Sequence, residues 1–391
     1  MHLVFATSIV PDGAPSTGYE IANAAIVDAL RRAGIRVTIL GFSWPGRIPA
    51  DPQNTLVLGS VDVRTDNASF RQKLTWLGRA VRAGLTFSSI KLRVVSPEAV
   101  RLALETIGPA DGYILNSVQF AAAYEEVFEG KPTIFVAHNV EHRSAAENAV
   151  ASKGLFQRTL FAREARLLRE IEARLCRKAR FVFTLAEEDR HALGVAEEGK
   201  SAFLPLVTRH SPAPGPVPRS LACDAALIGT WSWQPNRIGL DWFLDEVVPH
   251  LPPHFRIHIA GRVGGAIKSA HPGVTFVGRV PDATEFVRSG AVIPLISTAG
   301  SGVQIKTIET FELGLPSVAT TRSLRGIEAV PPNCIVADDP RAFARALEQA
   351  AQAAPRDIDG RAFFEGQRNA LDRQIVLGLE ALGCVGSRAF A

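Results

Sequence analysis

A glycine-rich turn followed by a lysine and a glutamate is the part of the sequence best suited to chemistry. The residues of the turn are Gly300, Ser301, Gly302, Val303 and Gln304. Backbone N–H groups at such a turn, with the positive end of a following helix, suit a diphosphate. Lys306 could place a cation on it, and Glu309, on the same helix face, could accept hydrogen bonds from ribose hydroxyls. The alternative is a plain strand-to-helix turn with a surface Lys–Glu pair.

A second polar cluster begins at His138 and includes Glu141 and His142. It matches the H-x-x-E-H pattern of some zinc peptidases, which requires both histidines on one helix. His138 directly follows an apolar run at residues 133–137, so we expect a histidine at the end of a strand. The four cysteines form no C-x-x-C pair, which argues against a zinc knuckle or a disulfide framework. We expect no metal site.

Short apolar segments alternate with amphipathic ones, which predicts parallel strands joined by crossover helices. In the first half we expect strands at residues 3–9, 36–40, 112–115, 133–137 and 181–185, and helices at 19–33 and 157–178. In the second half we expect strands at residues 225–228, 256–259, 275–277, 291–295 and 317–319, and helices at 239–250, 283–289, 306–314 and 341–353. The predicted fold class is α/β, with two doubly wound Rossmann-like domains. Such domains bind ligands at the carboxyl ends of their strands.

Four regions follow from this pattern. Residues 1–209 form an N-terminal Rossmann-like domain, and four prolines make residues 210–222 a stiff linker. Residues 223–360 form a C-terminal Rossmann-like domain, and residues 361–391 a helical segment that could cross back to the first domain. We expect the two domains to face each other across a cleft, which suits a reaction that excludes water.

The bulk composition fits a globular protein of two domains. The chain has 391 residues, of which 47% are hydrophobic and 21% are charged, with a formal net charge of +4. This mild charge does not call for nucleic acid as a partner. The first residues lack the basic region and long apolar core of a signal peptide, and no apolar stretch is long enough to span a membrane. We therefore expect a cytoplasmic protein.

One segment carries basic and apolar residues but no acidic ones. Its basic residues are Arg71, Lys73, Arg79, Arg82, Lys91 and Arg93. Leucine, valine and aromatic residues lie between them, which is typical of a helix that lies on an anionic membrane. The segment could thus hold the protein on the inner face of the cell membrane. The alternative is a solvated helix face over a core stripe.

The glycine-rich turn also carries a family resemblance. Residues 300–321 (GSGVQIKTIETFELGLPSVATT) resemble the donor-binding segment of family 4 retaining glycosyltransferases, which have the two-domain GT-B fold. Glu309 matches the second glutamate of that family's E-x7-E pattern, which holds the nucleotide ribose. Ser301 stands where the first glutamate would be, and Gln304 where arginine is common. The sequence is closest to a subgroup with a glycine-rich turn in place of the first glutamate.

Other parts of both halves are similar to the same family. In the C-terminal half these residues are Gly229, Thr230, Asn236, Gly261, Arg262, Gly278, Arg279 and Val280. The resemblance implies that Arg262 supplies a second cation to the diphosphate, unless it is a solvated loop residue. It implies that residues 278–280 contact the nucleotide base. In the N-terminal half it places His138 against the donor sugar with Glu141 beside it, and the acceptor-side residues are Ser16, Thr17, Gly18 and Glu141.

The function that the resemblance implies is sugar transfer from a nucleoside-diphosphate sugar to an acceptor hydroxyl. It implies a glycan or lipid-linked acceptor, retention of the anomeric configuration, and no metal or cofactor beyond the donor. His138, Lys306 and Glu309 would be the catalytic residues. In an inverting enzyme, His138 or Glu141 would act as the base. The alternatives are a nucleotide-sugar epimerase of the same fold and a non-catalytic two-lobed binding protein.

Overall fold

The computed structural model describes residues 1–13, 17–64, 68–152, 154–197, 199–213, 215–216, 218–262, 267–352 and 357–383. The side chain of Arg262 also lies outside this description. The chain divides into two compact units. Unit 1 comprises Met1–Leu206 and Ala370–Ala391, and unit 2 comprises Val207–Asn369. Within residues 210–222, the predicted linker, the described residues form no helix or strand.

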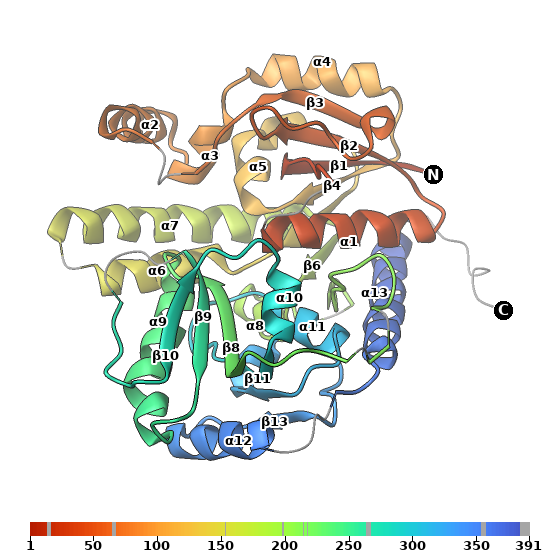
Figure 1. The fold of residues 1–391 in the computed structure, drawn as a ribbon. Coiled ribbons are helices and arrows are strands. Elements are labelled where there is room, and N and C mark those ends of the chain that lie inside the picture. Colours follow the sequence, from red (N-terminus) through yellow and green to blue (C-terminus); the bar gives the residue numbers. More distant parts are fainter. Residues whose placement is uncertain are drawn as a thin grey trace. The chain divides into compact units, whose positions relative to one another are not determined.

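Unit 1 is built on one parallel sheet of seven strands (Figure 1). The strands are β1 (His2–Ile9), β2 (Arg36–Ser43), β3 (Thr55–Ser60), β4 (Gly112–Asn116), β5 (Thr133–Ala137), β6 (Phe181–Thr184) and β7 (Ser201–Phe203). Their order is β3-β2-β1-β4-β5-β6-β7, and every pair is parallel. The order reverses at β1, which has β2 on one side and β4 on the other. Ligands of doubly wound sheets bind at the carboxyl ends of such a pair of strands.

The helices of unit 1 cover both faces of this sheet. They are α1 (Gly18–Arg32), α2 (Phe70–Ala83), α3 (Phe87–Leu92), α4 (Pro97–Ile107), α5 (Val118–Ala123), α6 (Glu141–Ala151), α7 (Leu155–Lys178) and α8 (Glu187–Ala192). Short 3-10 turns lie at Pro52–Asn54 and Glu125–Val127. Helix α13 (Arg361–Ala381) begins in unit 2, and its residues from Ala370 belong to unit 1. There it lies beside α1, because Arg32 pairs with Asp372 at 2.6 Å.

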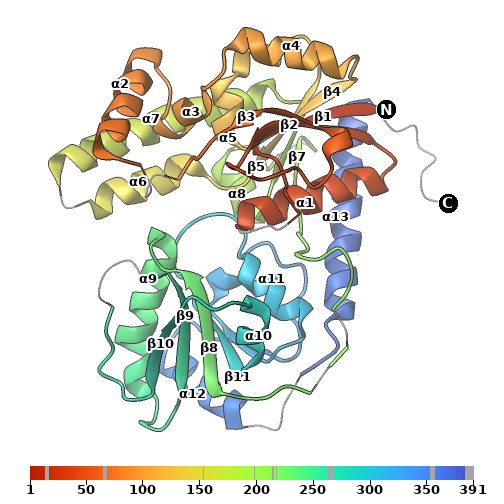
Figure 2. The ribbon, with the colours of Figure 1, turned by 45° about the horizontal axis from the view of Figure 1, so that its top comes forward.

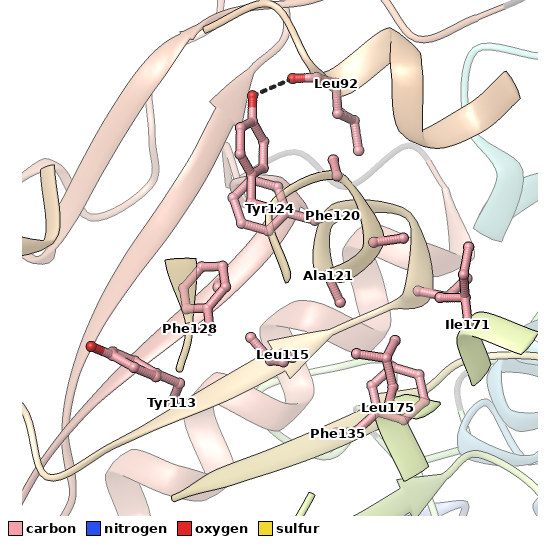
Figure 3. Close-up of a cluster of buried hydrophobic side chains, with 14 of the residues drawn as sticks. Leu92, Tyr113, Leu115, Phe120, Ala121, Tyr124, Phe128, Phe135, Ile171 and Leu175 are labelled. Atoms are coloured by element: carbon pink, nitrogen blue, oxygen red, sulfur yellow. Dashed lines mark hydrogen bonds between the residues drawn. The ribbon is translucent and has the colours of Figure 1, made fainter. Parts of the chain in front are cut away.

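A cluster of buried hydrophobic side chains in unit 1 includes residues of α5 (Figure 3). Phe120 and Tyr124 of α5 pack in one cluster with Leu115 of β4, Phe135 of β5 and other apolar side chains. The Tyr124 hydroxyl donates a hydrogen bond to the Leu92 carbonyl at 2.7 Å, so its one polar atom is satisfied. Burial raises the pKa of Tyr124 to about 12. This cluster holds the carboxyl ends of β4 and β5 firmly in place.

Unit 2 has a parallel sheet of six strands (Figure 2). The strands are β8 (Cys223–Thr230), β9 (Ile257–Arg262), β10 (Val274–Gly278), β11 (Gly290–Leu295), β12 (Ser317–Ala319) and β13 (Cys334–Val336). Their order is β10-β9-β8-β11-β12-β13, and all pairs are parallel. The order reverses between β8 and β11. The two sheets confirm the predicted fold class of two doubly wound α/β domains.

Helices cover both faces of the second sheet as well. They are α9 (Gln234–Trp242), α10 (Ala283–Arg288), α11 (Ile305–Glu312) and α12 (Pro340–Gln352). One face packs against α9 and α12 through Leu240 and Phe343, and the other packs against α11 through Phe311. The predicted helix at 239–250 is wrong as a single α-helix. Helix α9 starts earlier, continues as a π-helical stretch (Phe243–Val247) and ends in a 3-10 turn (Val248–His250) that contains Pro249.

The basic segment at residues 71–93 forms two helices, α2 and α3. Gly84 ends α2 in a left-handed conformation with φ of 65°. Only Ala80 of α2 is buried. Among the residues that the structure describes, no helix has the length and apolar character needed to cross a bilayer.

Candidate functional site

A pocket with a cavity volume of about 50 Å³ lies at the carboxyl ends of β8 and β11 in unit 2. Its polar lining includes Asn236, Gln304, Lys306 and Glu309, which the sequence analysis singled out. Its apolar lining includes Trp231, which the sequence analysis missed. Other predicted residues do not line this pocket, namely Gly229, Thr230, Gly261, Gly278, Arg279, Val280, Gly300, Ser301, Gly302 and Val303.

Lys306 is the cation of this pocket. It is the second residue of α11, so it lies in the first turn of the helix. Its Nζ is 5.0 Å from the ring centroid of Trp231. The indole of Trp231 is fixed, because its Nε1 donates a hydrogen bond to the Ala260 carbonyl at 2.8 Å. Among the described residues, no hydrogen bond or ion pair satisfies the ammonium group. Burial lowers the pKa of Lys306 to about 8, although the nearby Glu309 raises it.

Glu309 lies one turn after Lys306 on α11. Burial raises the pKa of its carboxyl group, and the positive charges of Arg209 and Lys306 oppose that shift. Within the described part of the chain, its carboxylate has no ion pair within 4.0 Å. A cation and a carboxylate therefore face one pocket without a direct bond between them.

Gly229 leaves room for Lys306 and Trp231, and Gly261 leaves room for the Gly229 backbone. A Cβ on Gly229 would lie 2.8 Å from the Trp231 ring and 2.9 Å from Lys306 Nζ. Gly261 has φ of +113°, and a Cβ there would lie 1.8 Å from the Gly229 carbonyl oxygen. Beside them, the Asn236 side chain donates a hydrogen bond to the Thr230 carbonyl at 3.2 Å. Asn236 lines the pocket, whereas Gly229 and Gly261 act on it through the space they leave for Trp231 and Lys306.

The glycine-rich turn leads from β11 toward α11. Gly300 and Gly302 have φ of 90° and 76°, a backbone conformation that favours glycine. A Cβ on Gly300 would lie 3.0 Å from Pro235, which lines the pocket. The buried guanidinium of Arg325 donates a hydrogen bond to the Gly300 carbonyl and so holds the turn. The sequence analysis gave Arg325 no role, because only the fold brings it to the turn.

The residues predicted to contact the nucleotide base or a second phosphate lie at the carboxyl ends of β10 and β9. Gly278 ends β10 with φ of +72°, and Arg279 after it is exposed. Arg262 is the last residue of β9, and its side chain is outside the described part.

Unit 1 carries a separate polar cluster at the carboxyl ends of β1, β4 and β5. His138 directly follows β5, as predicted from the sequence, and its Nε2 is 2.8 Å from Asn116 Oδ1 at the end of β4. The Tyr19 ring of α1 lies against the imidazole, with 4.7 Å between ring centroids. Asn116 also bonds to Asn23 of α1 at 2.7 Å. Burial lowers the pKa of His138 to about 3.

Glu141 and His142 belong to the start of α6 and not to the His138 cluster. Glu141 accepts a hydrogen bond from Gln119 at 3.1 Å, and burial, with Glu172 nearby, raises its pKa. The Glu172 carboxylate accepts from the backbone N–H groups of Glu141 and His142 and lies 2.6 Å from His142 Nδ1. His138 precedes α6, so the two histidines do not share a helix as a zinc peptidase requires. The described residues contain no group of three or more potential metal ligands.

The predicted acceptor-side residues lie at the start of α1. Thr17 is the N-cap, and it forms a capping box with Glu20. Glu20 also accepts a hydrogen bond from the Trp44 indole at 2.6 Å. Gly18 is the first residue of the helix. Ser16 lies outside the described residues. The structure therefore gives Thr17 a structural task.

Sequence reasoning missed several residues of the His138 cluster in unit 1 and of the Lys306 pocket in unit 2. Asn116 ends β4 and Ser117 follows that strand as directly as His138 follows β5, so the same rule would have found them. Tyr19 and Asn23 lie on α1 and reach the cluster only because β1 pairs with β4. No signal in the sequence marks Trp231 as the residue under Lys306.

The family comparison bears on unit 2. Residues 224–353 match the family model of glycosyl transferases group 1. The match runs from β8 to the end of α12 and includes the Lys306 pocket. It shows a glycosyltransferase domain and confirms the prediction that the chain is a glycosyltransferase. No curated protein matches the chain in sequence.

Solved structures share the fold of the whole chain. TarM has a TM-score of 0.60 at 11% identity, with 97% of this chain and 98% of that chain covered. HepE from Anabaena, in complex with UDP and glucose, has a TM-score of 0.58 at 13% identity over 97% and 100% of the two chains. WaaG, a glycosyltransferase involved in lipopolysaccharide biosynthesis, has a TM-score of 0.50 at 15% identity over 97% and 98%. At these identities the likeness shows the GT-B fold alone.

Proposed function

We propose that this protein transfers a sugar from a nucleoside-diphosphate sugar to an acceptor hydroxyl, with the donor diphosphate bound at the Lys306 pocket. The observation that carries the proposal is the Lys306 ammonium. It lies partly buried over Trp231 and has no anionic partner within hydrogen-bond distance among the described residues. A buried cation is costly unless an anion pairs with it. A diphosphate would supply that anion, in a domain that matches a glycosyltransferase family.

The chemistry follows from the charge that develops as the glycosidic bond to the diphosphate breaks. Lys306 and the backbone N–H groups at the start of α11 stabilise the negative charge on the leaving diphosphate. Glu309, in the same pocket, accepts hydrogen bonds from the ribose hydroxyls. Arg262 at the end of β9 is the candidate for a second cation. We propose that the reaction needs no metal or cofactor besides the donor.

Retention of the anomeric configuration is part of the proposal. An inverting enzyme needs a base for the acceptor hydroxyl. His138, with its pKa lowered to about 3, is a very weak base at neutral pH. In a retaining reaction the leaving diphosphate can take the acceptor proton itself. NMR of the product gives its anomeric configuration, and an inverted product would contradict this part of the proposal.

The acceptor is proposed to be a glycan or a lipid-linked sugar. The fold neighbour WaaG is involved in lipopolysaccharide biosynthesis. Helix α2 supports a membrane-bound acceptor, because Phe70, Leu74 and Val81 are 76%, 49% and 58% exposed. Their spacing of four and seven residues places them on one side of the helix. The apolar side of α2 is thus exposed. The same helix also carries Arg71 and Arg82.

We propose that α2 lies on the anionic inner surface of the cell membrane. Vesicles containing an anionic lipid should bind the protein, and neutral vesicles should bind it weakly. The double variant Arg71→Glu, Arg82→Glu should lose binding to the anionic vesicles. The matched control is Arg341→Glu, Arg345→Glu, which changes two exposed arginines on α12. Equal binding of the two double variants would contradict the α2 proposal.

A panel of nucleotide sugars tests the transfer reaction itself. The purified protein is incubated with each donor, with and without glycan and lipid-linked acceptors, and the products are separated by mass. We expect one donor to give a nucleoside diphosphate and a glycosylated acceptor. Release of nucleotide by no donor would contradict the proposal. An epimerised donor formed without acceptor would favour an epimerase instead.

A further inference from the structure

The His138 cluster in unit 1 is a chain of side-chain amides that ends on a backbone carbonyl. His138 Nε2 lies 2.8 Å from Asn116 Oδ1, and Asn116 Nδ2 lies 2.7 Å from Asn23 Oδ1. Asn23 Nδ2 lies 3.3 Å from the carbonyl oxygen of Ile9. Asn23 and Asn116 are fully buried. Water therefore does not replace these bonds, and each donor must meet an acceptor.

The carbonyl of Ile9 fixes the direction of every bond in this chain. A carbonyl oxygen only accepts, so the Asn23 atom that faces it is the amide nitrogen. The oxygen of Asn23 then faces Asn116, which must present its own amide nitrogen. The oxygen of Asn116 is left to face His138, and the imidazole must donate from Nε2. Reversal of both amides would bring two acceptors, the Asn23 and Ile9 oxygens, into contact.

Two hydroxyl groups also contact the amide nitrogen of Asn116 and are compatible with this orientation. Its Nδ2 also lies 3.2 Å from the Thr7 hydroxyl and 3.2 Å from the Tyr19 hydroxyl. Tyr19 accepts from the Ser8 backbone N–H at 3.1 Å and packs its ring on His138. The next residue, Ser117, has φ of 78° and ψ of 153°, a region that is essentially restricted to glycine. Such strain persists only where the surroundings over-determine the backbone, and here it adjoins Asn116.

We propose that Asn116 is a positioning residue that fixes His138 as the neutral tautomer with its proton on Nε2. This rests on the proposed transfer reaction for its functional meaning. In this tautomer Nδ1 carries a lone pair, so it accepts hydrogen bonds and cannot donate them. His138 would then accept a hydrogen bond from a substrate hydroxyl and act neither as general acid nor as general base. The role of His138 would therefore differ from that of the general base in an inverting enzyme.

The electrostatic surroundings agree with a neutral ring. Tyr19 from α1 is the titratable group in contact with the imidazole, and Glu141 follows at the start of α6. Burial lowers the pKa of His138, and among the described residues no charged group is a cause of the shift. A neutral imidazole with a hydrogen-bond partner costs less free energy to bury than a charged imidazole. The neutral form therefore suits this buried cluster.

Nitrogen-15 NMR of histidine-labelled full-length protein tests the tautomer without any substrate. His138→Gln identifies the signal by its loss. We expect a protonated Nε2 and an unprotonated Nδ1 from pH 5 to pH 8. A proton on Nδ1, or a protonation midpoint in that range, would overturn the proposal. Because this readout needs no turnover, it is independent of whether the sugar-transfer proposal is right.

Asn116→Asp tests the functional meaning. A carboxylate at this place favours the imidazolium, so the pKa of His138 should rise. The kcat/KM of the variant should then fall about tenfold per pH unit below the raised pKa, whereas the wild type should show no such decline. Asn54→Asp makes the same change at an exposed 3-10 turn and should follow the wild-type profile. An Asn116→Asp profile identical to that of the control would overturn the positioning role.

Discussion

The two sheets end in polar clusters of opposite character. In unit 1, His138, Asn116 and Asn23 are neutral, and they satisfy one another through hydrogen bonds of 2.7 and 2.8 Å. In unit 2, Lys306 and Glu309 carry opposite charges in a pocket and make no hydrogen bond to each other. A satisfied network fixes the position of a group, whereas a buried charge without a partner favours a ligand of opposite charge. This contrast supports the proposals of a positioning role for the cluster in unit 1 and of diphosphate binding in unit 2.

The largest expected effect comes from removing the Lys306 ammonium group from the pocket of unit 2. Lys306→Ala should lower kcat/KM by about 100- to 1000-fold, because it removes stabilisation of the charge on the leaving diphosphate. Arg345→Ala on α12 removes an exposed positive charge from the same unit and serves as control. Steady-state kinetics with the cognate donor measures both. Similar kcat/KM values for the two variants would contradict the role of Lys306.

The next effect concerns Glu312, which lies on the same helix as Lys306 and is fully buried. It accepts hydrogen bonds from the backbone and hydroxyl of Thr208. Burial raises the pKa of Glu312 to about 7. Its raised pKa contributes stability that is complete below the unfolded pKa of about 4.3 and is lost as pH rises to about 7. The loss is on the order of 3 kcal/mol.

Glu312→Gln removes this titration. The melting temperature of the wild type should therefore fall relative to that of the variant between pH 4.5 and pH 7.5, as measured by differential scanning calorimetry. Glu348→Gln, on α12, is a control and should follow the wild type. Parallel curves for wild type and Glu312→Gln would show that Glu312 keeps an ordinary pKa.

A smaller effect is expected at the glycine-rich turn. Gly300→Ala places a Cβ 3.0 Å from Pro235 on a backbone with φ of +90°. The turn must shift, and the KM for the donor should rise about tenfold. Gly366→Ala is the matched control, because a Cβ there has no neighbour within 4 Å. An unchanged KM in Gly300→Ala would separate the turn from donor binding.

The smallest effect tests the strain in unit 1. Ser117→Gly relieves a backbone conformation that Ser117→Ala retains. The glycine variant should be more stable than the alanine variant by about 1 kcal/mol. Denaturant unfolding followed by tryptophan fluorescence measures the difference. A more stable alanine variant would mean that Ser117 is not strained.

The central strands could be predicted from the sequence, and most edge strands could not. Buried parallel strands such as β5 and β11 are continuous apolar runs, because both faces are covered by helices. The three missed strands, β3, β7 and β13, all lie at sheet edges. There β3 and β13 are only partly buried and β7 has three residues, so no apolar run marks them.

The same contrast holds for the candidate sites. Lys306, Glu309 and Gln304 lie within six residues of one another, so a local pattern predicts that they share a pocket. The bond from Asn116 to Asn23 joins residues 93 positions apart. It depends on the pairing of β1 with β4 and on the packing of α1, which no local pattern specifies. Long-range networks of this kind therefore need the structure.

Titration calorimetry of nucleoside diphosphates tests the central claim most directly. The cognate diphosphate should bind wild-type protein at pH 7 and bind Lys306→Ala at least about tenfold more weakly. Its affinity for the wild type should fall as pH rises above about 8, where the lysine loses its proton. Equal affinity of wild type and Lys306→Ala at pH 7 would contradict the account.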